Sequence, residues 1–446
     1  MAVIGLYLEN FRCFSGPHFI PIKPITILVG ENSTGKSTIL GALTSLKYSM
    51  FNLNDAKFNI PPFEFGRFEE IITTKRNNSD DTFCLGLKLV SDFDYSCLLE
   101  FVFKYHNNDG KPEINNVVIR YKNTITIFIK EKEYWIYQIQ EDSLSDNDDD
   151  FTIMKHLSSL SMNDSDNKNR VLSAINDRFD PFFELAHEIG ERRSNYKDFT
   201  YITNVEIENL VLVRRFKLIN LPPYTNMPLK TFHSYEVERD DIVSYYATKL
   251  EHIMREQDME YAIHARDLFV EALKDFGEKS GLFTLIDIKR YGEPVGSRFE
   301  ILVQLKGHKH NLLNVGFGVS QSLPVLVEVL IRNPAATVTF QQPETHLHPR
   351  AQAALGSLFV YAIKHDSKRL VIETHSDYII DRIRMEIAKK KIANTDVQLL
   401  YTEFDNRALK DYTINLNENG DVINAPEGYR KFFREEKIKK LTRGDN

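Results

Sequence analysis

The stretch over residues 26–43, TILVGENSTGKSTILGAL, constrains the fold of this chain more than any other part of its sequence. A β-branched apolar run leads into a loop bounded by glycines, and the loop leads directly into a helix-like pattern. The pattern GxxxxGK[ST], which is typical of phosphate-binding loops, is met by Gly30, Gly35, Lys36 and Ser37. The stretch therefore predicts a strand, a phosphate loop and a helix whose N-terminus points at the anion.

The residue types in this loop indicate how it would hold a nucleoside triphosphate. Backbone N–H groups would curl around the phosphates, Lys36 would reach the β- and γ-phosphates, and the Ser37 hydroxyl would sit on Mg²⁺. The alternative is a strand–turn–helix in which the glycines serve only the turn. The predicted nucleotide-binding residues of the loop are Gly30, Asn32, Ser33, Thr34, Gly35, Lys36, Ser37 and Thr38.

The bulk composition is that of an ordinary folded protein. The chain has 446 residues and a formal net charge of -7, so no overall positive charge indicates a nucleic-acid partner. A net charge of this size does not exclude a local basic groove. Cys13, Cys84 and Cys97 lack metal-binding spacing and fit reduced thiols. No apolar run approaches the roughly 18 residues of a membrane span, and the N-terminus lacks a signal-peptide pattern. We therefore expect a cytoplasmic protein with no membrane contact.

Two kinds of sheet are predicted further along the chain. Segments between residues 82 and 141 alternate apolar and polar residues and are separated by turn signals, which indicates an antiparallel sheet. Later, the short runs TVTF and LVIE each end in polar residues before a helical pattern, which indicates a mostly parallel sheet covered on both faces. The acidic run EDSLSDNDDD is expected to be a solvated loop. Residues 170–190 and 236–281 have helical spacing and predict an inserted helical subdomain.

In their order along the chain, these motifs resemble those of the ABC-type ATPase heads related to SMC and RecF, and more closely the overcoming-lysogenization-defect (OLD) branch found in bacterial anti-phage systems. The motifs that carry the resemblance are GENSTGKS, GFGVSQSLP, QPETHLHP, ETHSD and NGDVINAPEGY. The resemblance covers nearly the whole chain and is weakest over residues 170–281. It implies an α/β fold: an ABC-type P-loop ATPase head with an antiparallel β subdomain and an inserted helical subdomain.

The same resemblance suggests a division of the chain. Residues 1–165 would form the N-terminal part of the head, and residues 283–446 its C-terminal part with a hairpin and a basic tail. Residues 166–282 would be the helical insertion, which would serve as a dimerisation or partner surface.

Several site residues follow from the resemblance alone. In such heads a signature at a helix N-terminus contacts the γ-phosphate held by the opposite subunit, so ATP joins two copies into a homodimer or a higher homo-oligomer. The alternative is a helix start that Ser320 caps. The residues that correspond to a divergent signature are Gly316, Gly318, Ser320 and Gln321.

His375 corresponds to the switch histidine that contacts the γ-phosphate. His346 and His348 are a weak metal candidate, and we assign them instead to the loop after the acidic strand. Arg12, in ENFRCF, either approaches the base or a phosphate of the nucleotide or is a solvated loop charge.

The sequence departs from the family after the strand TVTF. The family usually has at least one acid there, whereas this chain has Gln341 and Gln342. An amide can orient water or coordinate weakly, but it cannot take a proton. Either Glu344, the nearest carboxylate, supplies the chemistry in a natural variant, or Gln341 replaces a glutamate and traps the ATP-bound state. The predicted catalytic residues are Glu344, Gln341, Gln342 and His375, and the predicted metal ligands are Ser37 and Gln341.

A second departure concerns the lid glutamine of the family, which would be expected between Phe51 and Trp135. No glutamine lies there in this sequence, and Glu69 or Glu70 is a candidate substitute.

The resemblance implies an ATPase that needs ATP and Mg²⁺ and uses slow hydrolysis to switch an assembly. Because no TOPRIM-like segment follows the late hairpin, we expect a separate effector polypeptide, a nuclease or toxin, and a phage trigger. Among stand-alone defence ATPases, those of the PARIS system and then the Septu system are the most similar in organisation. The alternatives are a RecF-like repair ATPase that binds duplex DNA and a nucleotide-gated scaffold without turnover.

Overall fold

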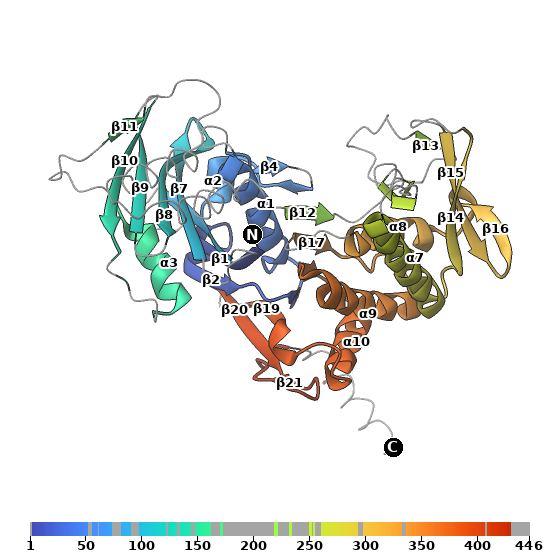
Figure 1. Ribbon diagram of the computed structural model, residues 1–446. Coiled ribbons are helices and arrows are strands. Elements are labelled where there is room, and N and C mark those ends of the chain that lie inside the picture. The colour runs from blue at the N-terminus through green and yellow to red at the C-terminus, as the bar shows by residue number, and fades with distance from the viewer. Residues whose placement is uncertain are drawn as a thin grey trace, which may run out of the picture.

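A computed structural model gives the fold of this chain (Figure 1). The residues that the structure describes are 2–51, 56–60, 62–73, 82–90, 98–121, 124–131, 134–142, 144, 148–161, 170–172, 218–221, 232–233, 249–251, 253–254, 260–292, 298–331, 336–405 and 408–429. The basic tail beyond residue 429 and most of the predicted insertion lie outside them.

A mostly parallel sheet forms the centre of the molecule, as the alternation of strands and helices predicts. Its strand order is β12-β17-β18-β3-β19-β20-β21, parallel from β12 to β19 and antiparallel beyond. The strands span Leu218–Leu221 (β12), Thr337–Gln341 (β17), Arg369–Glu373 (β18), Ile25–Gly30 (β3), Val397–Asp405 (β19), Ala408–Leu416 (β20) and Val422–Ile423 (β21).

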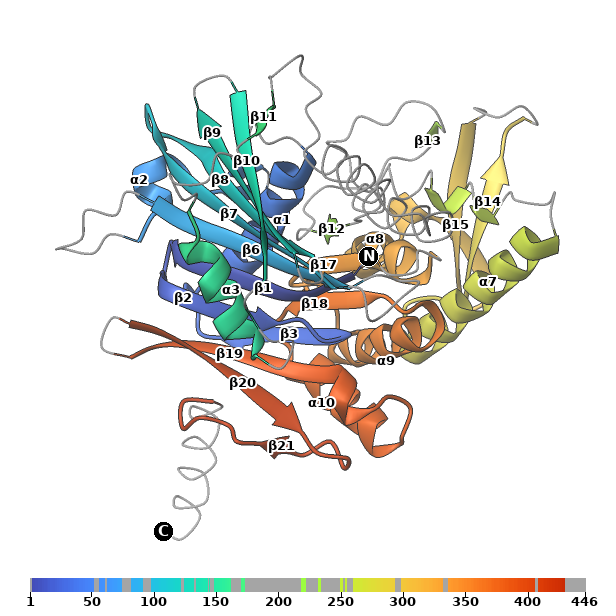
Figure 2. The ribbon, with the colours of Figure 1, turned by 60° about the vertical axis from the view of Figure 1, so that its left-hand side comes forward.

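An antiparallel sheet packs over one face of this core and confirms the antiparallel sheet predicted between residues 82 and 141. Its order is β11-β10-β9-β8-β7-β6-β1-β2, with α3 (Asp150–Ser159) lying across it in Figure 2. The strands are Ala2–Phe11 (β1), Phe14–Pro21 (β2), Thr82–Val90 (β6), Leu98–Asn108 (β7), Lys111–Tyr121 (β8), Thr124–Glu131 (β9), Tyr134–Glu141 (β10) and Arg170–Leu172 (β11).

Helices cover both faces of the parallel sheet. α1 (Lys36–Phe51) lies between it and the antiparallel sheet, while α8 (Phe317–Leu330), α9 (Pro349–Asp366) and α10 (Asp377–Ala388) cover the opposite face. The alternation along β18 shows the two sides: Val371 packs in the core with α1, whereas Leu370 and Ile372 pack in the core with α8–α10. Such a strand is buried on both faces, which explains its continuous apolar run.

A smaller unit lies beside α8 and α9. It contains α7 (Glu260–Ser280) and a sheet of β13 (Phe232–His233), β14 (Leu285–Arg290), β15 (Arg298–Leu305) and β16 (His308–Asn311). The short elements elsewhere are β4 (Asn59–Ile60), β5 (Phe63–Glu64), α2 (Phe68–Ile71) and the 3-10 turns Leu312–Asn314 and Asn394–Asp396. Over the described part of the chain, no helix has the length and apolar character needed to cross a bilayer.

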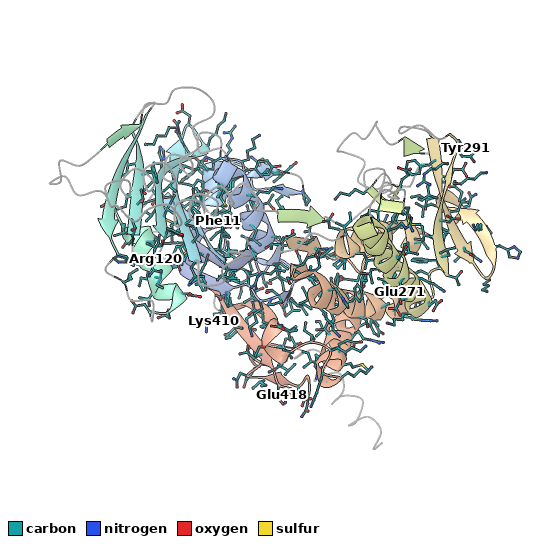
Figure 3. All side chains as sticks on the ribbon, viewed as in Figure 1. Phe11, Arg120, Glu271, Tyr291, Lys410 and Glu418 are labelled. Carbon is teal, nitrogen blue, oxygen red and sulfur yellow. The ribbon has the colours of Figure 1, made fainter. Side chains whose placement is uncertain are left out.

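The acidic run is not simply a solvated loop. The Asp142 side chain is 2% exposed and pairs with Arg120, whose guanidinium also donates to Glu100 Oε2 at 2.9 Å. Arg120 is labelled on the antiparallel sheet in Figure 3. Lys88 pairs with Glu100 on the other side at 3.0 Å. Asp149 accepts a hydrogen bond from Thr152 N and caps α3. The expectation was wrong at Asp142, because its charge compensates Arg120, which the antiparallel sheet buries, whereas Asp149 is exposed as expected.

A buried lysine ties α8 to the parallel sheet. Lys368, immediately before β18, has a side chain that is 0% exposed and forms an ion pair with Asp366 at 3.0 Å. Its ammonium donates to three carbonyl groups at the C-terminal end of α8, those of Glu328, Val329 and Ile331. A cation at this end satisfies carbonyls that have no partner within the helix.

Candidate functional site

The predicted phosphate loop leaves the carboxyl end of β3 at Gly30 and enters α1 at Lys36. Gly30 has φ +142°, and a Cβ atom there would lie 2.3 Å from the Thr402 carbonyl oxygen of β19. Gly35 has φ +87°, and its Cβ would lie 2.7 Å from Cys13 Sγ. Both positions therefore require glycine, for backbone conformation and for space.

The loop rests on β19. Thr402 pairs with Gly30 in the sheet register, and the hydroxyl oxygens of Thr34 and Thr402 are 2.9 Å apart. The Thr34 hydroxyl also donates to the Glu31 carbonyl at 2.8 Å. Asn32 and Ser33 stay exposed at the tip. The sheet thus fixes the base of the loop while the tip remains open to solvent.

Lys36 lies inside the loop with only 3% of its surface exposed. Its ammonium donates to the Gly30 carbonyl at 3.0 Å and also to the Glu31 carbonyl. Burial lowers the pKa of Lys36, against the raising effect of the carboxylates of Glu373 and Glu31. The loop thus holds a buried cation on its own carbonyl groups.

The Ser37 hydroxyl faces the ends of β17 and β18. It lies 2.9 Å from Glu373 Oε1 and 3.0 Å from Glu373 Oε2, so it donates to that carboxylate. Gln341 Nε2 lies 3.5 Å from Ser37 Oγ on the other side. The predicted metal ligands, Ser37 and Gln341, are therefore brought together. Glu373 is absent from the residues predicted from sequence, although its place at the end of a buried strand, directly before Thr-His-Ser, is a usable signal.

These groups suit Mg²⁺, which prefers oxygen ligands. A hydroxyl and a carboxylate converge at Ser37, and the buried Oε1 of Gln341 has no hydrogen-bond partner among the described residues. Within that same part of the chain, no group of three or more His, Cys, Asp or Glu side chains could hold a metal unaided, and this includes His346 and His348. A cation here would therefore depend on phosphate oxygens as well.

The turn after β17 joins the turn after β18. The backbone N–H of Gln342, a residue with φ +47°, donates to the Glu373 carbonyl at 2.8 Å. The His375 N–H donates to Glu344 Oε1 at 2.7 Å. Burial raises the pKa of Glu344. Partial desolvation, together with the charge of Lys36, lowers the pKa of His375. The predicted catalytic residues thus gather at one edge of the sheet.

The predicted signature residues begin α8. Gly316 is exposed and is the N-cap, so the alternative in which Ser320 caps the helix is wrong. Ser320 is 2% exposed and donates to the Phe317 carbonyl at 2.9 Å, and Gln321 is also buried. The accessible part of this motif is the backbone around Gly316 and Gly318. Next to it, the Phe317 and His346 rings lie 5.1 Å apart, which places the turn after β17 beside the start of α8.

Arg12 and the two lid candidates make local contacts. The Arg12 guanidinium donates to the carbonyls of Phe65 and Glu70 and lies 5.1 Å from the centre of the Phe65 ring. Asn107 donates to Glu69 Oε1 at 3.0 Å, and Arg67 N donates to Glu70 Oε2 at 2.7 Å. Arg12 therefore fastens the segment around α2 to β1 in this conformation.

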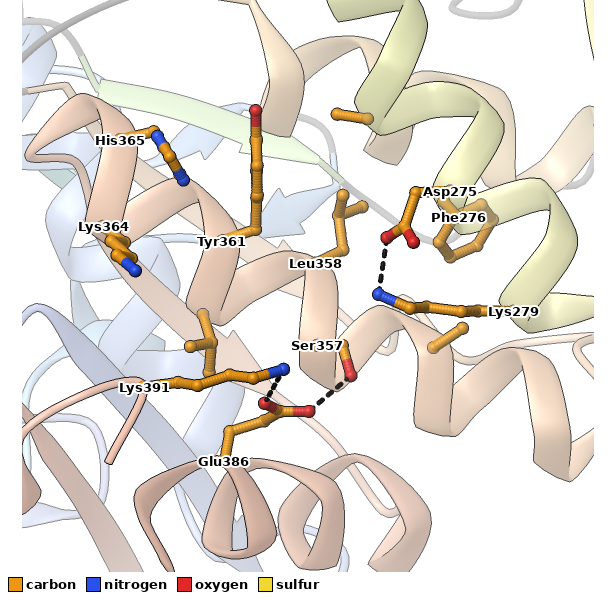
Figure 4. A pocket seen from close by; sticks show the side chains of 13 residues that line it. Asp275, Phe276, Lys279, Ser357, Leu358, Tyr361, Lys364, His365, Glu386 and Lys391 are labelled. Carbon is orange, nitrogen blue, oxygen red and sulfur yellow. Dashed lines mark hydrogen bonds and ion pairs between the residues drawn. The ribbon is translucent and has the colours of Figure 1, made fainter. Parts of the chain in front are cut away.

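A separate cavity lies between α7, α9 and α10, away from these residues (Figure 4). Phe276 and Leu358 contribute apolar surface, and the Glu386 carboxylate accepts from Ser357 at 3.0 Å and pairs with Lys391 at 2.9 Å. None of the predicted site residues lines it.

Comparisons with known proteins found a matching family model and similar solved structures. The sequence model described as an AAA ATPase domain matches residues 1–380. A structure of an SMC head bound to the C-winged helix domain of ScpA is similar, with a TM-score of 0.52, 10% identity, and coverage of 93% of this chain and 99% of that one. The SMC head with a coiled coil and joint from Pyrococcus yayanosii gives a TM-score of 0.46 at 10% identity, covering 98% and 99%. A search of curated proteins gave no match. The predicted fold class, an ABC-type P-loop ATPase head, is confirmed.

Proposed function

This chain belongs to the AAA ATPase domain family, and we propose that it is an ATP-driven switch that controls a separate effector protein in defence against phage. It is an ATPase of the ABC-like type to which SMC, RecF and OLD proteins belong. The observation that carries the ATP-binding part of the proposal is the loop at residues 30–37, which brings Lys36 and Ser37 beside polar side chains from two neighbouring strand ends.

The proposed roles follow from this geometry. Lys36 binds the β- and γ-phosphates, and the backbone N–H groups of the loop surround them. Ser37 contributes its hydroxyl to Mg²⁺, a cation whose charge stabilises the transferring phosphoryl group. His375 contacts the γ-phosphate from the turn after β18, and Glu344 holds that turn in place. We assign the orientation of the attacking water to Gln342 from the resemblance alone, because it stands where the family has an acid and an amide can orient water.

We further propose that two or more copies assemble around ATP. The exposed start of α8 supports this, because the free N–H groups at a helix N-terminus favour an anion such as the partner's γ-phosphate. In this arrangement the backbone at Gly316 and Gly318 makes the contact. The similar SMC head was solved with a domain of ScpA bound, which supports a protein partner for this chain too.

The defence role rests on the motifs shared with OLD-type proteins, above all QPETHLHP and ETHSD. The PARIS ATPase and then the Septu ATPase are the nearest analogues in organisation. By that analogy the effector is a nuclease or toxin, of TOPRIM type in the PARIS case, and a phage component is the trigger.

The test compares wild-type protein with Lys36→Ala and with the control Lys274→Ala, which removes an exposed lysine from α7. ATP affinity and molar mass in solution should change only in Lys36→Ala, which should bind no ATP and should not gain mass when ATP is added. Unchanged ATP affinity in Lys36→Ala would contradict the proposal. Salt-dependent binding of duplex DNA, with no co-purifying effector, would favour a RecF-like repair function instead.

A further inference from the structure

We propose that Glu373 at the end of β18 supplies the carboxylate that faces Mg²⁺ in the nucleotide site, in place of an acid on β17. The inference rests on the proposed ATP-binding function and deepens it. It identifies the residue that supplies a negative charge to Mg²⁺, which the neutral amides of Gln341 and Gln342 cannot supply.

The hydrogen bond to Ser37 identifies Glu373. In P-loop NTPases the Ser or Thr of the loop and an acidic residue at a strand end together hold Mg²⁺. Here both carboxylate oxygens of Glu373 lie within 3.0 Å of Ser37 Oγ. The residue expected from its place in the sequence, Gln341, approaches the same hydroxyl only with an amide nitrogen at 3.5 Å.

The sheet register explains how the carboxylate can come from the neighbouring strand. Gln341 and Glu373 are directly paired, and Glu373 is paired on its other side with Leu28 of β3. Adjacent strands lie about 4.8 Å apart, a distance that a glutamate side chain can span. Since β18 stands between β17 and β3, an acid at its end is nearer to the phosphate loop than one on β17.

The burial of Glu373 favours a cation at this place. Glu373 is 3% exposed, so its carboxylate is largely removed from water. Both of its oxygens accept from the Ser37 hydroxyl. Burying a carboxylate is costly, and a divalent cation beside it would offset the cost.

The amide at Gln341 fits the same account. A glutamate there would stand directly opposite Glu373 on the paired strand, and like charges in that position repel each other. One carboxylate at position 373 and one amide at position 341 avoid this repulsion. Gln341 is thus explained as the natural partner of Glu373 and need not be read as a replaced glutamate.

The experiment measures the affinity of purified full-length protein for a fluorescent ATP analogue, with Mg²⁺ or with EDTA. In the wild type Mg²⁺ should tighten binding at least about tenfold, and in Glu373→Gln this ratio should fall to near one. Glu278→Gln removes an exposed carboxylate from α7, outside the loop, and should keep the wild-type ratio. Glu373→Asp keeps the charge but withdraws it by one methylene group, and it should give an intermediate ratio.

A relocation variant separates a metal-facing role from a structural one. Gln341→Glu combined with Glu373→Gln returns the carboxylate to β17 and should regain part of the Mg²⁺ dependence, which a structural glutamate would not do. If Glu373→Gln keeps the full dependence while Lys36→Ala abolishes binding, the inference is overturned and the proposed function stands. If the wild type binds no ATP analogue, the proposed function itself fails.

Discussion

Replacing Glu344 should show whether this carboxylate holds the switch turn or takes a proton during hydrolysis. Its Oε1 accepts a hydrogen bond from the His375 backbone N–H at 2.7 Å, so the carboxylate fixes the turn that carries the histidine. We expect Glu344→Ala to slow ATP hydrolysis strongly and Glu344→Gln to slow it only slightly. The reason is that a glutamine oxygen can still accept this hydrogen bond.

The magnitudes follow from the strength of that contact. A hydrogen bond to a charged group contributes about 1.5–3 kcal/mol, so its complete loss corresponds to roughly 10- to 150-fold in rate. A neutral acceptor keeps about half of the strength, so Glu344→Gln should lose only about 3- to 13-fold. Loss of a general base would cost about 100- to 10,000-fold in either variant.

The assay is phosphate release at saturating ATP, together with ATP affinity, which should stay within about twofold of wild type in both variants. Glu278→Gln, an exposed position on α7, serves as the matched control. A loss of 100-fold or more in Glu344→Gln, equal to that in Glu344→Ala, would refute the positioning role and assign proton transfer to Glu344.

Two further predictions concern the frame around the site. Gly30→Ala should abolish ATP binding without unfolding the protein, because its Cβ would overlap the Thr402 carbonyl; nucleotide titration and circular dichroism check this, and retained affinity would contradict it. Lys368→Met should lower the free energy of unfolding by about 3–5 kcal/mol, since it removes a buried ion pair and the donor to three carbonyls of α8. Urea unfolding measures the change, and a loss below about 0.5 kcal/mol would count against it.

The parts of the fold that could be predicted are those encoded locally. The phosphate loop is a contiguous motif, and Gly30 and Gly35 stand where only glycine fits, so one stretch of sequence fixes strand, loop and helix. The alternation from β6 to β10 is likewise a property of neighbouring residues. Both could be recognised without knowing what packs against them.

The parts that could not be predicted depend on which segments become neighbours. Glu373 lies in a motif that was noted for its histidine, but its contact with Ser37 exists only because β18 is placed between β17 and β3. Ser320 has the residue type expected at a surface contact, yet α8 turns it toward the buried side. Asp142, directly after β10, similarly gains its role from Arg120 on β8.

The pairing of Gln341 with Glu373 bears on how degenerate ATPases are recognised. A chain that lacks acids at the expected strand end can look like a pseudoenzyme. In a parallel sheet, however, the ends of two adjacent strands lie side by side at the same edge. Substitutions during evolution can therefore replace an acid on one strand by an acid on the next, and the site still contains one carboxylate. For sequences of this kind, the acidic residues at the ends of all neighbouring strands should be considered before the protein is classed as inactive.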